Sequence, residues 1–579
     1  MKLEFQKGSR SKILAGFILL TMVIFAVRLF YLQIIQHDYY VSVAKGEQVK
    51  RLTIPAKRGK IYALDAGVPV PLVMNQTIYT VFADPQITRD DEKIIEVIKK
   101  VAGGNARADL QKLLDKKDSR YQILATKISR IQADKIKSEN LKGIGFQEYT
   151  QRVYPEGALA GQTLGFVNDE GLGQYGVEEK LDERLSGKDG LLQSVTDISD
   201  VPLTIGDNNI NIPAVDGDNV VLSIDRNIQS KLEQVISDKA STSGADRISA
   251  IVIDPLTGRV MALANTPSYN PAEFNKVSDV GLFNNSAVSA PYEPGSDMKT
   301  LTMAVGIDKG VVSPTDTYYN TDFIKVDDRV ISNSARGFIG DLTFQFAMNW
   351  SLNTGFVTVA KRLGDGENIT REARNTMYDY FSNRFMLGRK TGIEIAGEAS
   401  GTLISPEEVE GNAVRYSNMS FGQGLDTTLV QVSAAFCSIV NGGKYYKPTI
   451  VAGLVDKDGK YKESAISEPT IALSKSTADQ VRAMAREVRT TASSNIDKPG
   501  YYIGGKTGTS QVVVNGSYDI NTAIGTYLGY GGSEEQSRYV IMVESYAANR
   551  VMVGASQAGP VFTAMSNYLL DYLKIQPKG

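Results

Sequence analysis

Glu293-Pro294-Gly295-Ser296-Asp297-Met298-Lys299 is the stretch that decides the fold of this 579-residue chain. Proline and glycine followed by an apolar run mark the start of a helix, so we expect a helix to begin at the serine. Residues three apart share one helix face, which predicts that the Ser296 hydroxyl and the Lys299 amine converge. Taken alone, a serine three residues before a lysine is a common surface pattern.

The histidine count limits which base could activate that serine. The chain has one histidine, His37, so a Ser-His-Asp triad is excluded. A lysine that is desolvated among positive neighbours loses proton affinity and can act as the base instead. A serine at a helix N-terminus also presents its own N–H to developing negative charge.

Two further motifs follow in order along the chain. Ser351-Leu352-Asn353 offers a hydroxyl that can relay a proton and an amide that can hold a substrate amide, or it could simply cap a helix. Lys506-Thr507-Gly508-Thr509 runs into a strand-like segment, where glycine lets a ligand approach an edge strand and lysine and threonine suit a carboxylate. A nucleotide-binding loop is disfavoured there, because the preceding glycine is displaced by one position and no helix follows.

A long apolar segment near the N-terminus predicts a membrane anchor. Residues 13–35 read ILAGFILLTMVIFAVRLFYLQII and contain one charge, Arg28. At about 1.5 Å per residue this segment spans a hydrocarbon core of about 30 Å. The residues before it carry four basic side chains and one acid, so residues 1–12 form a cytoplasmic tail and the rest lies outside. An apolar run of this length without an A-x-A-like site indicates an uncleaved signal anchor rather than a signal peptide; a buried core helix is the alternative.

Composition excludes several classes of protein. The net charge of −2 gives no basic footprint for nucleic acid. One cysteine, Cys437, excludes an internal disulfide and a cysteine-based zinc site. We expect no metal and no cofactor. The length predicts two to four domains.

Periodicity gives a coarse order of elements. The segments expected to be regular are a strand at 77–82, helices between 90 and 140, a glycine-rich stretch at 144–190, a strand at 220–224, a helix at 226–240, and a hairpin at 250–265. All three motifs fall in the last part of the chain, which is α/β in composition.

Taken together, the motifs and their surroundings resemble class B penicillin-binding proteins, the monofunctional peptidoglycan DD-transpeptidases, over nearly the whole chain. Other matching stretches are Arg58-Gly59-Lys60-Ile61, Ala83-Asp84-Pro85, Arg152-Val153-Tyr154-Pro155, Gly173-Gln174-Tyr175-Gly176-Val177-Glu178, Leu222-Ser223-Ile224-Asp225, Pro267-Ser268-Tyr269-Asn270-Pro271, Ser420-Phe421-Gly422-Gln423-Gly424 and Asn441-Gly442-Gly443. The resemblance implies an α/β chain: an α+β pedestal (dimerisation) domain at 36–217 and, at 218–575, a transpeptidase domain of the serine β-lactamase-like fold, with an antiparallel sheet flanked by helices.

The resemblance also implies roles for the motif residues. Ser296 would attack the penultimate D-Ala carbonyl, Lys299 would take its proton, Ser351 would pass a proton to the leaving amine, and Asn353 would hold the donor amide. Lys506, Thr507, Gly508 and Thr509 would bind the terminal carboxylate, with backbone N–H groups of Ser296 and Thr509 as the oxyanion hole. β-Lactams would acylate the same serine. Implied partners are stem peptides, the membrane, a separate glycosyltransferase and division proteins.

Two residues favour the septal branch over the elongation branch of the family, namely Glu293 before Pro-Gly-Ser and Asn353 where elongation enzymes often carry aspartate. A silent scaffold, a β-lactam sensor, a carboxypeptidase and a β-lactamase remain alternatives. Asp297 departs from the family, which has a small or apolar residue there. On a helix Asp297 points about 100° and 200° away from Ser296 and Lys299, so as a solvated first-turn carboxylate it would affect acylation little.

Overall fold

The computed structural model describes residues 9–40, 49–195, 210–493, 496–514 and 516–578. The chain divides into two compact units. One comprises residues 1–58 and 186–217, and the other comprises residues 59–185 and 218–579.

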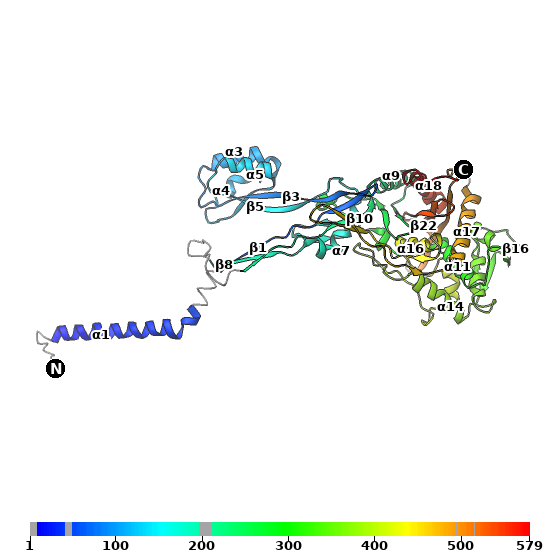
Figure 1. Ribbon diagram of the computed structural model, residues 1–579, viewed down its shortest axis with the longest axis horizontal. Coiled ribbons are helices and arrows are strands. Elements are labelled where there is room, and N and C mark those ends of the chain that lie inside the picture. Colours follow the sequence, from blue (N-terminus) through cyan, green and yellow to red (C-terminus); the bar gives the residue numbers. More distant parts are fainter. Residues whose placement is uncertain (1–8, 41–48, 196–209, 494–495, 515, 579) are drawn as a thin grey trace. The chain divides into compact units, whose positions relative to one another are not determined.

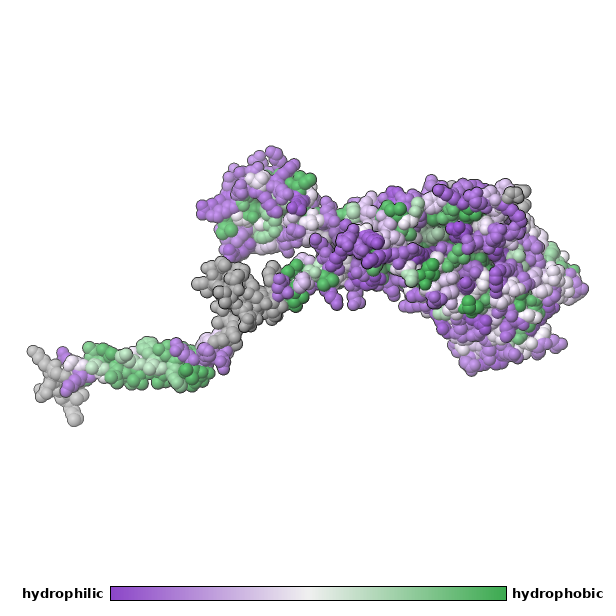
Figure 2. Space-filling model, in the orientation of Figure 1, coloured by the Kyte–Doolittle hydropathy of each residue, from purple (hydrophilic) through white to green (hydrophobic). Residues whose placement is uncertain are grey.

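The first unit contains the apolar helix. Helix α1 (Ser9–Phe30) continues into a π-helical turn, η1 (Tyr31–Ile35). Within the described residues, 10–35 is the one helix long and apolar enough to cross a membrane, and none of its most apolar stretch is buried. Figure 2 shows α1 as a nearly continuous hydrophobic surface. The same unit holds an antiparallel sheet of β1 (Val49–Ile54), β8 (Gly190–Val195) and β9 (Ile210–Ile212) in the order β1-β8-β9.

In the second unit, one sheet joins segments that are far apart in sequence. Its order is β19-β18-β10-β2-β3-β4, and β5 also pairs with β3. The strands are β2 (Ile61–Asp65), β3 (Val68–Ala83), β4 (Gln122–Ser129), β5 (Ile144–Val153), β10 (Asn219–Asp225), β18 (Val451–Val455) and β19 (Tyr461–Glu463). Strand β10 pairs in parallel with β2. The sheet therefore joins the start of the later α/β part to a strand formed by residues 61–65, much earlier in the sequence.

A small α+β lobe forms around the second half of β3. Strands β4 and β5 flank it, and α3 (Asp91–Ala102), α4 (Leu110–Leu114) and α5 (Arg130–Ser138) contribute to a core of their own. Asp90 caps α3, and Ser129 with Gln132 forms a capping box on α5. The helices expected between residues 90 and 140 are present, with β4 between α4 and α5.

A buried ion pair and its hydrogen bonds connect three of the stretches in which the sequence resembles the family. Arg152 Nη2 lies 2.8 Å from Glu178 Oε1, and the two side chains are 5% and 0% exposed. Arg152 Nη1 also donates to Gly59 O at 2.8 Å and to Asn75 Oδ1 at 2.7 Å. Removing one partner of such a pair costs roughly 3–5 kcal/mol, because an unpaired charge is left buried.

The five-stranded antiparallel sheet is the scaffold of the site. Its order is β12-β11-β23-β22-β21, formed by β12 (Val260–Thr266), β11 (Arg247–Ile253), β23 (Ser537–Tyr546), β22 (Ser517–Gly532) and β21 (Tyr502–Val514). Helices α9 (Arg226–Ser243) and α18 (Gly554–Tyr572) pack on one face. Helices α16 (Leu429–Val440) and α17 (Lys475–Ser493) pack on the other, and α11 (Met298–Asp308) packs against these two helices (Figure 1). The predicted α/β class with helices on both sides of an antiparallel sheet is confirmed.

The two central helices are buried on every side. All residues from Met298 to Ile307 of α11 are buried, and so is every residue of α16. A helix that is apolar all round belongs inside a large core or in a membrane, and at 12 residues α16 is too short to span one. The region around α11 is completed by α12 (Phe344–Asn349), α13 (Asn353–Arg362), α14 (Arg371–Tyr378) and α15 (Ala413–Met419).

Candidate active site

Ser296 lies in a short turn that is pressed against the edge strand. Gly295, Ser296 and Asp297 form a 3-10 turn, and α11 begins at Met298. Gly295 has a φ of +56°, and its N–H donates to Gly422 O at 2.9 Å. A Cβ on Gly295 would lie 3.0 Å from Thr509 O. The glycine therefore lets the backbone at Ser296 approach β21 closely.

Lys299 is a buried amine surrounded by acceptors. It is 1% exposed, and its Nζ donates to Ser351 O at 2.7 Å, Ser351 Oγ at 3.0 Å and Asn353 Oδ1 at 2.7 Å. Burial, and then the charge of Lys506, hold the pKa of Lys299 well below its usual range. The lowered proton affinity expected of this lysine is therefore present. A lysine whose pKa is lowered in this way gives up its proton more readily and, once neutral, can accept one.

Ser351 connects the lysine to the serine. Its Oγ donates to Ser296 Oγ at 2.9 Å while accepting from Lys299. Within the described residues, Lys299 therefore reaches Ser296 through Ser351 rather than by a direct hydrogen bond. Ser351 has a φ of +57°, which is uncommon for a residue with a Cβ. Such strain persists where the surroundings impose it, and it is concentrated at functional sites.

Asn353 is held at both ends of its amide. Oδ1 accepts from Lys299, and Nδ2 donates to Ser332 O at 2.9 Å. Helix α13 begins at Asn353, with Leu352 as its N-cap and no side-chain cap. The alternative that Ser351 and Asn353 merely cap a helix is therefore wrong.

The third motif lies on β21, at the edge of the five-stranded sheet as expected. Lys506 is 2% exposed, and its Nζ donates to Thr507 O at 3.0 Å. Burial lowers the pKa of Lys506 to about 8, and the charge of Asp297 opposes that shift. Alternation along the strand puts Lys506 and Gly508 on one face and Thr507 and Thr509 on the other. Thr509 is exposed, and its Oγ1 accepts from Gly554 N at 3.3 Å.

Asp297 is not a solvated first-turn carboxylate, so that expectation was wrong. It is 0% exposed, and Oδ2 accepts a hydrogen bond of 2.6 Å from Thr526 Oγ1. Burial raises the pKa of Asp297 to about 7, against the opposing effects of the Thr526 hydrogen bond and the charge of Lys506. Helix geometry correctly directs the side chain away from Lys299, but β21 and β22 cover that direction.

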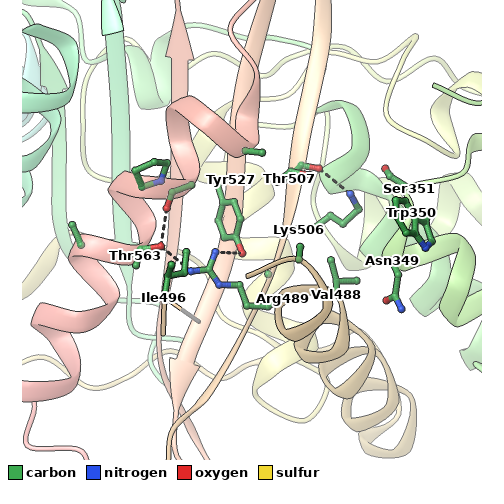
Figure 3. A pocket seen from close by; sticks show the side chains of 16 residues that line it. Asn349, Trp350, Ser351, Val488, Arg489, Ile496, Lys506, Thr507, Tyr527 and Thr563 are labelled. Carbon is green, nitrogen blue, oxygen red and sulfur yellow. Dashed lines mark hydrogen bonds between the residues drawn. The ribbon is translucent and has the colours of Figure 1, made fainter. Parts of the chain in front are cut away.

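A cavity of about 680 Å³ opens beside these residues. Ser351, Lys506 and Thr507 line one part of it, and α17 and α18 line the rest with largely apolar side chains. Figure 3 shows the Lys506 side chain pointing toward the Ser351 and Trp350 side of the cavity, with Arg489 at the opposite end. The volume is in the range of ligand sites, 300–1,000 Å³.

Arg489 is a buried charge that the sequence analysis did not find. It is 2% exposed, pairs with Asp497 at 2.8 Å, and donates to Tyr527 Oη at 3.0 Å and Thr563 Oγ1 at 2.7 Å. Its position on a charged helix gives no sign of burial, because two of its partners, Tyr527 and Thr563, come from segments distant in sequence. The described residues contain no group of three or more His, Cys, Asp or Glu side chains that could hold a metal.

A lysine-dependent serine site on a helix behind an antiparallel sheet is typical of acyl-transfer proteins that lack a catalytic histidine. The chain belongs to the penicillin-binding proteins. The family model "Penicillin binding protein transpeptidase domain" matches residues 248–567, which is more than half of the chain. A second model, "Penicillin-binding Protein dimerisation domain", matches residues 53–222.

Individual relatives match along most of their length. Stage V sporulation protein D of Bacillus subtilis is 29% identical over 567 residues, covering 96% of this chain and 85% of that protein. Peptidoglycan D,D-transpeptidase FtsI of Escherichia coli is 26% identical over 587 residues, covering 98% of this chain and 92% of that protein. Both alignments therefore extend over nearly the whole of this chain.

Solved structures share the fold. Penicillin-binding protein 2X of Streptococcus thermophilus superposes with a TM-score of 0.74 at 23% identity, covering 91% of this chain and 80% of that one. A peptidoglycan synthetase of Bifidobacterium adolescentis gives a TM-score of 0.72 at 23% identity, covering 92% and 98%. The transpeptidase fold expected from the three motifs is thereby confirmed.

Proposed function

We propose that this protein is a peptidoglycan DD-transpeptidase of the septal type, which cross-links stem peptides through an acyl-serine intermediate and binds penicillin. One observation carries the proposal. A continuous hydrogen-bonded path runs from Ser296 through Ser351 to a buried lysine of lowered pKa, Lys299, beside an edge strand that carries a second buried lysine.

In the first half-reaction, Ser296 Oγ attacks the penultimate D-Ala carbonyl carbon of a donor stem peptide. Its proton moves to Ser351 Oγ as the Ser351 hydroxyl proton moves to neutral Lys299, so in this step the two hydrogen bonds run in the reverse direction, from Ser296 to Ser351 to Lys299. The C–N bond to the terminal D-Ala then breaks, and its amine leaves with the proton returned through Ser351. An ester between Ser296 and the donor remains. Proton transfer by positioned groups of this kind typically contributes about 10²–10⁴-fold to the rate.

In the second half-reaction, an amine of another stem peptide attacks the ester carbonyl. The new C–N bond is the cross-link, and the C–O bond to Ser296 breaks. Lys299 takes the proton from the attacking amine, and Ser296 Oγ regains one through Ser351. Backbone N–H groups of Ser296 and Thr509 serve as the oxyanion hole, supported by the close approach of Gly295 to Thr509 O.

Substrate binding is assigned to the edge strand and to Asn353. Lys506, with Thr507, Gly508 and Thr509, holds the terminal carboxylate, because a buried cation beside an open strand edge suits that group. Asn353 fixes Lys299 through Oδ1 and retains one amide hydrogen beyond its bond to Ser332 O for the donor amide.

The placement in the cell follows from the anchor. Residues 1–12 form a cytoplasmic tail, 13–35 span the membrane, 36–217 form the pedestal (dimerisation) domain, and 218–575 form the extracytoplasmic transpeptidase domain. The basic residues before the apolar segment support this orientation. As a monofunctional enzyme, the protein would work with a separate membrane glycosyltransferase and with division proteins.

Labelling full-length protein in detergent with fluorescent penicillin tests the chemistry. The expected adduct forms on Ser296, and Ser296→Ala abolishes it. An adduct persisting in Ser296→Ala would overturn the assignment, and labelling without cross-linking of a donor and an acceptor peptide would indicate a silent scaffold. Depletion distinguishes the branches: undivided cells are expected, whereas loss of elongation with lateral-wall localisation would indicate the elongation type.

A further inference from the structure

The Asp297 carboxylate occupies the space that a side chain at position 508 would take. A Cβ on Gly508 would lie 2.1 Å from Thr526 Oγ1 and 2.8 Å from Asp297 Oδ2. Thr526 is the residue opposite Gly508 in the β21–β22 pairing. The glycine of the third motif thus makes room for an acid that comes from the first motif.

This acid lies on the same face of β21 as Lys506. Residues two apart on a strand project from one face, and they are separated by roughly 7 Å along it. Lys506 and Asp297 are both buried, and among the described residues no ion pair within 4.0 Å joins Lys506 to any acid. Asp297 Oδ1 has no hydrogen-bond partner there. The two groups therefore interact through space, in surroundings that screen charge poorly.

Other charged or titratable groups face Asp297 from each packed element. Tyr292 and Tyr527 feel its charge, but burial raises the pKa of Tyr527 to about 12 and that of Tyr292 well above 10. Glu544 lies opposite Thr526 on β23 and is paired with Arg247 at 2.6 Å. Lys299 is influenced by Lys506. Asp297 and Lys506 are thus the groups here with pKa values near neutrality, at about 7 and about 8, and burial holds the pKa of Lys299 well below its usual range.

We infer that Asp297 is a positioning residue that decides which of the two buried lysines carries the proton: by lying on the Lys506 side, it keeps Lys506 cationic and leaves Lys299 neutral. This inference rests on the proposed function, because it assigns Lys506 to the substrate carboxylate and Lys299 to the serine proton. Two buried ammonium groups repel each other, and a single nearby acid stabilises only one of them.

The expected size of the effect follows from Coulomb's law. The spacing of alternate strand residues, roughly 7 Å, sets the order of magnitude: one charge at such a distance, with an effective dielectric constant near 20, shifts a neighbour's pKa by on the order of one unit or more. Without Asp297, Lys506 loses its proton at lower pH. Binding of a ligand carboxylate by Lys506 then weakens at neutral and alkaline pH. The acylation rate with a substrate that has no carboxylate should not change.

The test compares benzylpenicillin with its methyl ester, which lacks the carboxylate. Second-order acylation constants are measured from pH 6 to 10 for the full-length wild type and for Asp297→Asn. We expect the advantage of the acid over the ester to be lost at a pH about one unit lower in the variant, which is a loss of about fivefold near pH 8 and approaches tenfold at higher pH. Asp308→Asn is the matched control, because Asp308 ends the same helix and bonds Tyr380, Ser474 and Thr477.

Asp308→Asn should keep the wild-type pH profile even where it lowers stability. Thr526→Val is the second variant, for use if Asp297→Asn does not fold. It keeps Asp297 but removes the hydrogen bond that favours its ionised form, so a smaller shift of the pH profile in the same direction is expected. Two outcomes would overturn the inference. One is that wild type and Asp297→Asn have the same pH profile of acylation; the other is that the variant loses acylation rate equally with benzylpenicillin and with its methyl ester. A wild type that forms no Ser296-dependent adduct would remove the proposed function as well.

Discussion

Tyr518 donates a hydrogen bond of 3.0 Å to Glu293 Oε1, and this contact ties β22 to the residue three positions before Ser296. The same oxygen accepts from Gly424 N at 2.7 Å. Burial raises the pKa of Glu293, while these two hydrogen bonds oppose the shift. The start of β22, the loop at Gly424 and the approach to the serine thus meet at one carboxylate.

Tyr518→Phe should loosen the start of β22 without changing any group that performs chemistry. A hydrogen bond to a charged group is worth about 1.5–3 kcal/mol, so we expect faster amide exchange around Tyr518 and acylation slowed by roughly tenfold. Hydrogen exchange and penicillin acylation measure the two effects.

Tyr539→Phe is the control for this variant. It removes the hydroxyl of a buried tyrosine, which bonds Ser566 Oγ at 2.7 Å on the α18 side of the sheet. A matching loss of stability with unchanged acylation is expected there. Equal acylation by the two variants would show that the Tyr518 contact has no part in shaping the site.

Ser351 gives a prediction that separates stability from activity. Ser351→Ala and Ser351→Gly both remove the hydroxyl between Lys299 and Ser296, so each should slow acylation by about 10²–10⁴-fold. Glycine adopts a positive φ at no steric cost, so Ser351→Gly should be the more stable of the two variants. Thermal unfolding and acylation kinetics decide it. Acylation retained in either variant would mean that Lys299 reaches Ser296 directly.

Lys506→Ala should weaken acylation by benzylpenicillin by on the order of a hundredfold, because the ligand carboxylate loses its cation in a buried site. Its effect on the methyl ester should be much smaller. Lys498→Ala is a suitable control, since Lys498 is a partly exposed lysine that pairs with Asp571. Unchanged kinetics with the acid would show that Lys506 serves only the packing of β21.

Local signals in the sequence were enough to predict the motif-bearing elements. Proline and glycine before Ser296 correctly marked a helix start, and the strand, helix and hairpin expected from 220 to 265 are present as β10, α9, β11 and β12. The parallel pairing of β2 with β10 could not be predicted from periodicity, because it joins strands more than 150 residues apart.

The same limit applies within the site. The spacing of Ser296 and Lys299 indicated their shared face, but not the path through Ser351, since that serine comes from a separate segment. Helix geometry gave the direction of the Asp297 side chain and could not reveal what covers it. The burial of Asp297 depends on Gly508 and Thr526, more than 200 residues further along the chain.

The burial of Asp297 predicts a distinctive dependence of stability on pH. Its pKa rises from 3.8 to about 7 on folding, so between these values the folded state binds more protons than the unfolded state. The contribution of this group to stability is therefore complete below about pH 3.8 and is lost as the pH rises through 7. Lys506 has the opposite sign, because its pKa falls from 10.5 to about 8 on folding, and stability returns as the pH rises above 8.

Asp297→Asn removes the first of these two effects and keeps an acceptor for Thr526. Near pH 5 the variant should already be somewhat more stable than the wild type, because unfolded wild type ionises Asp297 above pH 3.8 while the folded state still holds the proton. As the pH rises to 7 the advantage of the variant should grow, and above pH 7 it should level off, because Asp297 is then ionised in both states. Thermal unfolding of the full-length protein in detergent at pH 5, 6, 7 and 8 measures this difference, with Asp308→Asn as the control that should not reproduce the trend. A difference between Asp297→Asn and wild type that stays constant from pH 5 to 8 would mean that Asp297 is ionised throughout this range in the folded protein, and that burial does not raise its pKa.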